Sequence, residues 1–341
     1  MDKPLSGKMK KIGFLLSLIL GLLLLVVAFP TVYLLNPSWF EASIDANQWR
    51  PRDIENDLGD HPKAPLIKYG YDLITRTPEL IGPLAEANMQ YAGNHLTCKS
   101  CHLKAGTKAG AGSFVGVFNR FPQFRGRENK IGTLEERIQG CMERSMNGRV
   151  LPKGGLELQG MVAYMKWLSE DVPETLIERY KGYAKVELPE IKADTVLGRQ
   201  IFTQNCIECH KADGQGEKNS KGTMYAYPPL WGPDSFNHGA GMHRVITAAA
   251  FIKGNMPYEK ATLDVPFLSD EEAYHVAAYI NSFPRPLKSD PAADFPDKKL
   301  KPVSTPYGPW TDDFSPEQHK YGPFQPIMKF YQEQYGLAKS K

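Results

Sequence analysis

The sequence carries almost no excess of charge of either sign. Among 341 residues, 41 Lys and Arg oppose 38 Asp and Glu, which gives a formal net charge of +3. The first 35 residues hold four lysines and one aspartate, so the rest contains 37 basic and 37 acidic residues. A neutral body lacks the basic face that recognises nucleic acid, and we expect no nucleic acid among the partners. The 42% hydrophobic content is enough for a buried core, which excludes a chain that is disordered throughout.

No clear small-x-small cleavage site precedes Pro37, which argues against a cleaved signal peptide. Residues 12–35 contain no charge, and a helix of that length spans ~36 Å, more than the ~30 Å hydrocarbon core of a bilayer. Three lysines within residues 8–11 place this end in the cytoplasm by the positive-inside rule. We therefore predict a cytoplasmic tip and transmembrane anchor over 1–35, a single pass in a bacterial inner membrane, and a body in the periplasm.

Five cysteines cannot all pair within one chain, and four of them form two C-x-x-C-H motifs at 98–102 and 206–210. This motif attaches c-type haem, because one helical turn places both thiols at the haem vinyl groups and the histidine under the iron. A zinc site needs four ligands, and one cysteine pair in each half is too few. A redox C-x-x-C does not require the following histidine. We predict two covalently attached haem c groups, held by Cys98, Cys101, His102, Cys206, Cys209 and His210.

Strand patterns are scarce, and one order of segments occurs twice: helix, C-x-x-C-H, loop, helix and closing helix. This order predicts a mainly α fold with two tandem class I cytochrome c-like haem domains after the N-terminal transmembrane helix, and an extended C-terminal tail. The predicted segments after the anchor are a linker (36–65), an N-terminal haem domain (66–185), a C-terminal haem domain (186–285) and an aromatic-rich tail packed on the body (286–341).

Helix ends are also marked in the sequence. Capping boxes at Thr133 with Glu136, and at Ser269 with Glu272, predict two helix starts. Gly148 predicts the end of the helix that begins after Thr133.

The iron of the second haem is expected to take a methionine as its sixth ligand. Met256 lies 46 residues after His210 in the string Gly-Asn-Met-Pro, and a thioether next to proline presents sulfur to iron rigidly. The alternative role of Met256 is core packing. The competing ligands are Met224, Met242, His238 and His243.

The fifth cysteine, Cys141, lies 39 residues after His102 and has no thiol partner once the other four hold haem. An exposed free thiol outside the cytoplasm would be oxidised, so two roles remain. Cys141 is either a buried inert cysteine or a thiolate ligand of the first haem iron. Spacing alone leaves both roles open, together with ligation by Met142, Met146, Met161 or Met165.

A basic stretch surrounds Cys141. Residues 120–153 hold eight basic and four acidic residues. Arg137, Cys141 and either Arg144 or Ser145 are spaced to share one helix face. An arginine-lined pocket over a haem suits a small polyanion. A solvated helix face with Glu–Arg pairs explains the same composition.

Five strings resemble the dihaem thiosulfate dehydrogenase family of bacterial c-type cytochromes. The resemblance covers roughly residues 50–335, and its most specific part is the cysteine in a C-x-E-R-S-M-N-G stretch. The strings are, in chain order, GNHLTCKSCHL, FPQFRGR, LEERIQGCMERSMNG, IKGNMP and PYGPWTDDFSPEQHKYGPFQPI.

The resemblance implies that the first haem is catalytic and that the second transfers electrons. It also implies a catalytic role for Cys141 and, around the same haem, for Arg127, Arg137 and Ser145. Its implied iron ligands are His102 and Cys141 for the first haem, and His210 and Met256 for the second.

Some family members exchange the methionine ligand for a lysine directly before it. Here that position is Asn255, and Lys253 stands three residues before Met256. A ligand exchange is therefore not expected.

The reaction that the resemblance implies is oxidation of two thiosulfates to tetrathionate, or the reverse, with one thiosulfate held at Cys141 as a transient sulfur adduct. The implied partners are thiosulfate or tetrathionate, and an external electron acceptor or donor, which is another cytochrome or a quinone-linked complex. Two other classes stay open: a dihaem electron carrier with no substrate of its own, and a sulfur-oxidation (Sox) type dihaem subunit that needs a partner protein. The tail motif favours thiosulfate dehydrogenase over the Sox type, by resemblance alone.

Overall fold

The N-terminal helix α1 (Leu5–Leu35) is the longest element of the chain. The structure is a computed structural model that describes residues 5–35 and 48–340. Side chains from Met9 to Val32 are exposed wherever they are described, and this stretch is long and apolar enough to cross a membrane. Such a helix near an N-terminus suits a membrane anchor or a signal sequence. The predicted linker lies partly outside the described residues, at 36–47, and its described part leads through turns to residue 63.

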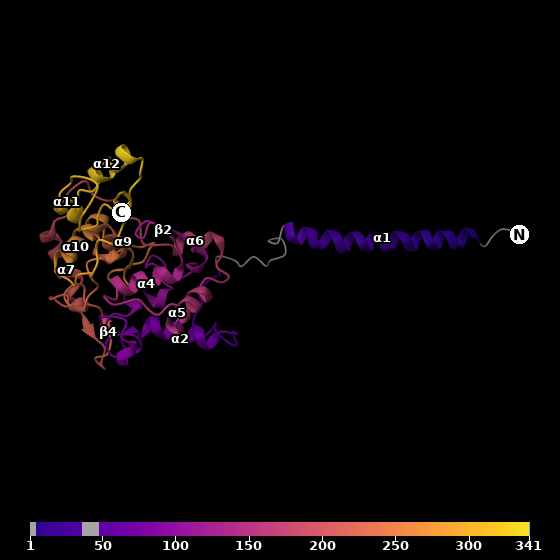
Figure 1. Cartoon of the computed structure of the whole chain (residues 1–341), viewed down its shortest axis with the longest axis horizontal. Helices are drawn as coiled ribbons and strands as arrows, with labels where there is room; N and C mark the ends of the chain where they lie inside the picture. The colour runs from indigo at the N-terminus through magenta and orange to yellow at the C-terminus, as the bar shows by residue number, and fades with distance from the viewer. Residues whose placement is uncertain (1–4, 36–47, 341) are drawn as a thin grey trace. The chain divides into compact units, whose positions relative to one another are not determined.

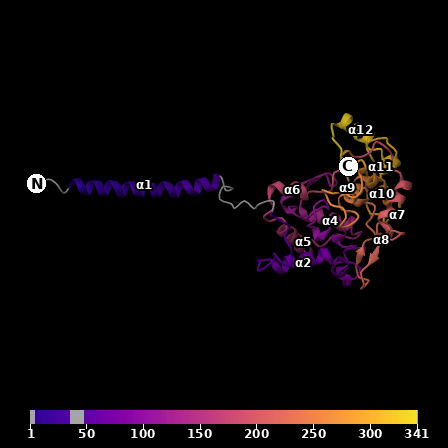
Figure 2. The ribbon, with the colours of Figure 1, turned by 180° about the vertical axis from the view of Figure 1, so that it is seen from behind.

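The first haem-motif half is built around two helices in close contact. Helices α2 and α5 lie side by side in Figures 1 and 2, and a Cβ at Gly70 would lie only 1.9 Å from the carbonyl oxygen of Gly160. Glycine at position 70 therefore lets the two backbones touch. The helices of this half are α2 (Ala64–Thr75), α3 (Thr77–Leu80), α4 (Leu134–Arg144), α5 (Leu156–Trp167) and α6 (Glu174–Tyr180). The 3₁₀ turns are η2 (Ala87–Met89), η3 (Cys98–Ser100), η4 (Lys104–Gly106) and η5 (Phe118–Arg120).

The second half has its own core, in which Trp231 stacks on Phe283 at 4.0 Å between ring centroids. Helix α10 packs between α7 and α9, so the buried faces of three helices enclose one apolar cluster. The elements are α7 (Thr195–Asn205), α8 (Ile207–His210), η6 (Gly241–His243), α9 (Val245–Asn255) and α10 (Asp270–Ser282). The predicted order of helix, motif, loop, helix and closing helix is present in both halves.

Strands among the described residues are short and form two antiparallel hairpins. Strand β1 (Gln123–Arg125) pairs with β2 (Lys130–Gly132), and β3 (Glu217–Lys218) pairs with β4 (Tyr225–Tyr227). The prediction of a mainly helical protein is confirmed.

Both predicted capping boxes are present. The Thr133 hydroxyl accepts a hydrogen bond from the backbone of Glu136 at 3.3 Å, and Ser269 does the same for Glu272 at 3.2 Å. Helix α4 ends at Arg144, one turn before the predicted stop at Gly148. The chain turns at Asn147, which takes a left-handed φ of 46° that asparagine tolerates better than most residues.

The C-terminal tail is not extended throughout, which corrects the prediction for residues 286–341. After turn η7 (Lys298–Leu300) it forms helices α11 (Pro316–Tyr321) and α12 (Gln325–Tyr335), beside α7 and α10 in both views (Figures 1 and 2). The Ser315 hydroxyl caps α11, and Gly336 ends α12 in the left-handed conformation. The buried side chains Phe324, Ile327 and Tyr331 join the second core, so these helices form by packing against it.

One loop joins the two halves. Phe236 and Ala240, which follow β4 in the second half, are buried in the core of the first. Asn237 donates from its side chain to the carbonyl of Glu143 at 2.8 Å, and its backbone N–H donates to the carbonyl of Arg144 at 3.1 Å. The loop thereby brings η6 and the start of α9 to the C-terminal end of α4.

Candidate active site

The first C-x-x-C-H motif is held in a shape that suits haem. Turn η3 begins at Cys98, and the backbone N–H of His102 donates to the carbonyl of Cys98 at 3.0 Å. The His102 Nδ1 lies 2.7 Å from the carbonyl oxygen of Gly112, so this nitrogen carries the proton and donates it. The Nε2 atom is then free to bind a metal. Gly112 has φ +61°, and a Cβ there would lie 3.4 Å from the His102 ring.

The second motif repeats this arrangement on different elements. Helix α8 ends at His210, whose Nδ1 lies 2.9 Å from the carbonyl oxygen of Pro228. Burial lowers the pKa of His210, which favours the neutral imidazole that metals bind. In both motifs the backbone therefore fixes the tautomer that leaves Nε2 unprotonated, as a metal-binding nitrogen must be.

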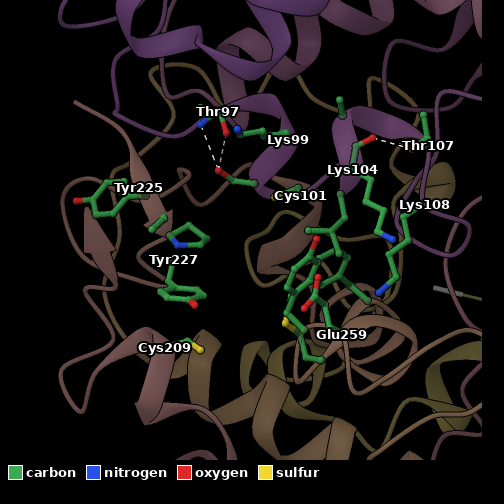
Figure 3. Close-up of a pocket in the computed structure, with 18 of the residues that line it drawn as sticks. Thr97, Lys99, Cys101, Lys104, Thr107, Lys108, Cys209, Tyr225, Tyr227 and Glu259 are labelled. Atoms are coloured by element: carbon green, nitrogen blue, oxygen red, sulfur yellow. Dashed lines mark hydrogen bonds between the residues drawn. The ribbon is translucent and has the colours of Figure 1, made fainter. Parts of the chain in front are cut away.

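A cavity of about 1130 Å³ extends between the two motifs. Cys101 from the first half and Cys209 from the second border it (Figure 3). His210 and Met256 also line it. A typical small-molecule pocket measures ~300–1,000 Å³, so this space suits large prosthetic groups. Cys206, Cys209 and His210 line this cavity together with Cys101, whereas Cys98 and His102 do not. The thiols, the histidine Nε2 atoms and the cavity suit haem c, the group that C-x-x-C-H motifs hold.

Met256 caps the C-terminal end of α9 and lines the same cavity as His210. Of its predicted competitors, Met242 lines the cavity too, whereas His243 bonds through Nδ1 to the carbonyl of His238. The His238 Nδ1 accepts a hydrogen bond from the backbone of residue 288 at 2.8 Å. Met224 does not line the cavity.

Lys253 and Asn255 are both engaged away from an iron position. The Lys253 ammonium forms an ion pair with Asp270 and donates to the carbonyl of Lys185 at 2.9 Å. Asn255 is fully buried and donates to the carbonyl of Gly110 at 2.8 Å. Whether Lys253 exchanges with Met256 stays a prediction.

Cys141 lies on α4 and faces both an arginine and the histidine of the first motif. The Arg137 guanidinium, one turn earlier, donates to the Cys141 Sγ at 2.8 Å. Burial by itself raises the pKa of this thiol, but Arg137 and His102 outweigh burial and lower the pKa to about 6. The site thus favours the thiolate, which is the form that binds metals and attacks sulfur. The alternative ligands are buried in the first core: Met142, Met146, Met161 and Met165.

A second, smaller pocket of about 200 Å³ lies beside α4 and is lined by five arginines. The predicted residues Arg127, Arg137 and Ser145 all line it, so the fold brings the three together. Burial is the main cause that lowers the pKa of Arg144 to about 10, and the positive charge of Arg127 adds to it. The remaining polar lining residues are Arg125, Arg144 and Arg244.

The alternative to an anion pocket was a solvated helix face with Glu–Arg pairs. Two close ion pairs do exist at the pocket, but they involve residues outside α4. Arg125 donates to Glu128 at 2.8 Å, and Arg127 forms an ion pair with Asp294. Five guanidiniums therefore meet three carboxylates, Glu128, Glu143 and Asp294, among the described residues at this wall. The net charge of these side chains is positive, so the pocket attracts small anions.

Sequence reasoning missed two residues of this pocket. Arg244 comes from the second half, about 100 positions after the other arginines, and Asp294 comes from the tail. The tail backbone is bound directly to the pocket wall, because the N–H of Phe295 donates to the carbonyl of Arg127 at 2.8 Å. No local pattern marks either residue, since both reach the pocket only through packing of distant segments.

Two family models match the chain in tandem. One is described as SoxA/TsdA, cytochrome c domain, and matches residues 88–173. The other is described as cytochrome c and matches residues 195–284. The prediction of two tandem cytochrome c domains is confirmed, and such domains imply a haem cofactor.

Several known proteins resemble the chain over most of its body. It is 39% identical to a thiosulfate dehydrogenase of Stutzerimonas stutzeri over 68% of this chain and 71% of the relative. It is 45% identical to a thiosulfate dehydrogenase of Allochromatium vinosum over 60% of this chain and 75% of the relative. A solved thiosulfate dehydrogenase (TsdBA) of Marichromatium purpuratum superimposes with a TM-score of 0.62 at 35% identity, over 71% of this chain. This chain spans half the length of that solved chain.

Proposed function

The chain belongs to the thiosulfate dehydrogenase family, and from this we propose that it converts two thiosulfates into one tetrathionate with release of two electrons, or runs the reverse reaction. The observation that carries the proposal is the arginine pocket next to the Cys141 thiol. A carrier with no substrate of its own has no use for five arginines gathered beside one haem motif. Thiosulfate and tetrathionate are small dianions, which is the class of ligand that such a pocket attracts.

The proposed iron ligands are His102 and Cys141 for the first haem, and His210 and Met256 for the second. The Nδ1 hydrogen bonds of both histidines and the low pKa of Cys141 support this set. Each bound haem would supply a one-electron acceptor. The electrons then pass to an external cytochrome or quinone-linked complex. Helix α1 anchors the chain in the bacterial inner membrane, with the body in the periplasm.

The chain's own residues divide the work at the first motif. Arg137 stabilises the Cys141 thiolate through its hydrogen bond at 2.8 Å. Arg127 and Ser145, on the wall of the same pocket, bind sulfonate oxygens of the substrates. Bound in this way, the two dianions are held together against their mutual repulsion.

The proposed bond changes balance as follows. The terminal sulfur of the first thiosulfate bonds to the Cys141 Sγ, and two electrons leave this pair. The terminal sulfur of the second thiosulfate attacks the sulfur bound to Sγ, which forms the central bond of tetrathionate. The bond to Sγ breaks, the Cys141 thiolate returns, and no proton is exchanged.

The test mixes oxidised holoprotein with thiosulfate, and separately reduced holoprotein with tetrathionate, while the haem α-band is followed. We expect haem reduction in the first mixture or oxidation in the second, and the faster of the two indicates the direction. Silence in both, from haems that still respond to dithionite and ferricyanide, contradicts the proposal. It would favour the electron carrier or the partner-dependent Sox type.

Cys141→Ala and Cys141→Met provide the matched variants. Both are expected to keep two attached haems and to lose thiosulfate turnover, because neither supplies a thiolate. Full thiosulfate turnover by either variant would contradict the proposed role of the Cys141 thiolate. Steady-state turnover with an artificial electron acceptor, together with the haem content, measures the outcome.

A further inference from the structure

Arg244 differs from the other four arginines of the pocket in having no anionic neighbour. Arg125 pairs with Glu128, Arg127 pairs with Asp294, and Arg137 bonds to Cys141. Arg144 lies 3.7 Å from Asp294. Among the described residues, the side chain of Arg244 makes one long hydrogen bond, from Nε to the carbonyl of Gly241 at 3.4 Å, and no ion pair.

The surroundings of Arg244 are unfavourable for an unpaired cation. Burial, together with the positive charges of Arg127 and Arg137, lowers the pKa of its guanidinium to about 9. Tyr307 and Tyr183 are the nearby groups that act in the opposite direction. The Arg244 side chain is only partly buried, because it borders the open pocket. Three guanidiniums around one small pocket repel one another, and an anion bound between them offsets that repulsion.

The pocket also limits what that anion is. Its volume of about 200 Å³ is below the ~300–1,000 Å³ of pockets for drug-sized ligands, so it suits a small ion. Guanidinium forks match oxygens of a sulfonate in pairs, which a single ammonium does not. Two thiosulfates bring four negative charges, and Arg127 already shares its charge with Asp294.

We propose that Arg244 is a substrate-binding residue that holds the sulfonate of one thiosulfate from the second-haem side of the pocket. The arginines of the first half then hold the other thiosulfate near Cys141. This inference rests on the proposed function and deepens it, because it makes the substrate site a joint product of both cytochrome domains. The bond from Asn237 to the Glu143 carbonyl at 2.8 Å is one of the contacts that hold the two walls together.

The test compares Arg244→Gln and Arg244→Lys with the wild type, as full-length chains carrying both haems. We expect Arg244→Gln to raise the KM for thiosulfate about 10- to 100-fold, as expected when a hydrogen-bonded charge contact is lost. The value of kcat should change much less, and Arg244→Lys should lie between the two. Sulfate, a non-reacting dianion, should inhibit the variants with an inhibition constant raised in parallel, which a merely structural role would not produce.

Arg285→Gln is the matched control. Like Arg244, Arg285 is an arginine of the second half without an ion pair among the described residues, but it is buried, stacks on Phe236 and lines neither pocket. Its KM for thiosulfate should equal that of the wild type. An unchanged KM in Arg244→Gln, from a wild type that oxidises thiosulfate, overturns the inference and leaves the proposed function standing.

A wild type without thiosulfate chemistry overturns the proposed function and, with it, this inference. If Arg244→Gln fails to fold, Arg244→Lys decides the matter. The lysine keeps the charge but loses the paired contact, so its KM should rise about threefold or more. Wild-type KM in a folded Arg244→Lys overturns the inference.

Discussion

Asp294 is the carboxylate that offsets charge in the arginine pocket. Its side chain is only 6% exposed, and it accepts hydrogen bonds from Arg127 and, at 3.1 Å, from the Tyr307 hydroxyl. The Arg127 guanidinium also lies 4.8 Å above the ring of Phe295. A single tail segment therefore positions Arg127 and offsets part of the positive charge that it brings to the pocket.

Asp294→Asn should show how much the fold depends on this carboxylate. The change keeps the shape but leaves Arg127 and Arg144 with less compensation, so the free energy of unfolding should fall by about 3–5 kcal/mol. Denaturant titration of the holoprotein measures the difference. The exposed Asp313 provides the control, and Asp313→Asn should unfold like the wild type. Equal stability of the two variants would mean that solvent already screens the Asp294 pair.

At the level of single residues, the sequence indicated one side of the pocket only. Arg137 and Cys141 are four positions apart, so a helix alone makes them neighbours. The partner of Arg127 is 167 positions away, in a segment without periodicity. A residue with such a partner is identified only when the chain is folded.

Helix α9 connects the proposed thiosulfate pocket with the proposed methionine ligand of the second haem. Arg244 caps its N-terminal end at the arginine pocket, and Met256 caps its C-terminal end at the large cavity. The string around Met256 was informative because the ligand chemistry is local. Arg244, at the other end of the same helix, carries no motif, and its role follows from the loop that docks η6 against α4.

The tail shows where segment predictions fail for physical reasons. Its Pro- and Gly-rich composition favours extended chain, yet α11 and α12 form because Phe324, Ile327 and Tyr331 find a core to pack against. Lys301, within the same tail, is 2% exposed and donates to the carbonyl of Pro309 at 3.1 Å. Its ammonium lies 4.7 Å from the ring centroid of Tyr307.

Lys301 should make the stability of the protein depend on pH. Burial lowers its pKa from 10.5 to about 8, so between these values the unfolded chain binds the proton more tightly than the folded one. The free energy of unfolding contributed by this group should therefore rise from pH 8 to pH 10.5 and stay constant below pH 8. Denaturant titrations at pH 7.5 and 9.5 should show a larger rise for the wild type than for Lys301→Met.

The exposed Lys299 is the control for that comparison. Lys299→Met should keep the pH profile of the wild type. If Lys301→Met gives the same rise with pH as the wild type, Lys301 titrates as freely in the folded chain as in the unfolded one.

At the scale of the whole molecule, the chain divides into two units, residues 1–49 and 50–341. Both hydrophobic cores and both haem motifs lie in the second unit. The described part of the first unit is dominated by α1, whose apolar side chains are exposed wherever they are described. The division separates a membrane-seeking element from the part that performs the proposed chemistry.

A chain without residues 1–47, exported by a separate leader, should be soluble and should keep two haems and the thiosulfate response. The full chain should sediment with membranes and dissolve only in detergent. Leu22→Arg places a charge in the middle of α1 at a cost of about 3 kcal/mol and should weaken membrane retention. A mature N-terminus beyond residue 35 would show that α1 is a cleaved signal sequence, contrary to the proposed anchor.

The sequence by itself determined the features that depend on short spacing. The haem motifs, the capping boxes and the uncharged helix each occupy a few neighbouring positions, where covalent geometry and helical periodicity leave few alternatives. The tertiary structure alone decided that Arg244 and Asp294 reach the wall that Arg127 and Arg137 form. Distances between segments a hundred residues apart depend on how the two cores, the joining loop and the tail pack, and no local pattern encodes that packing.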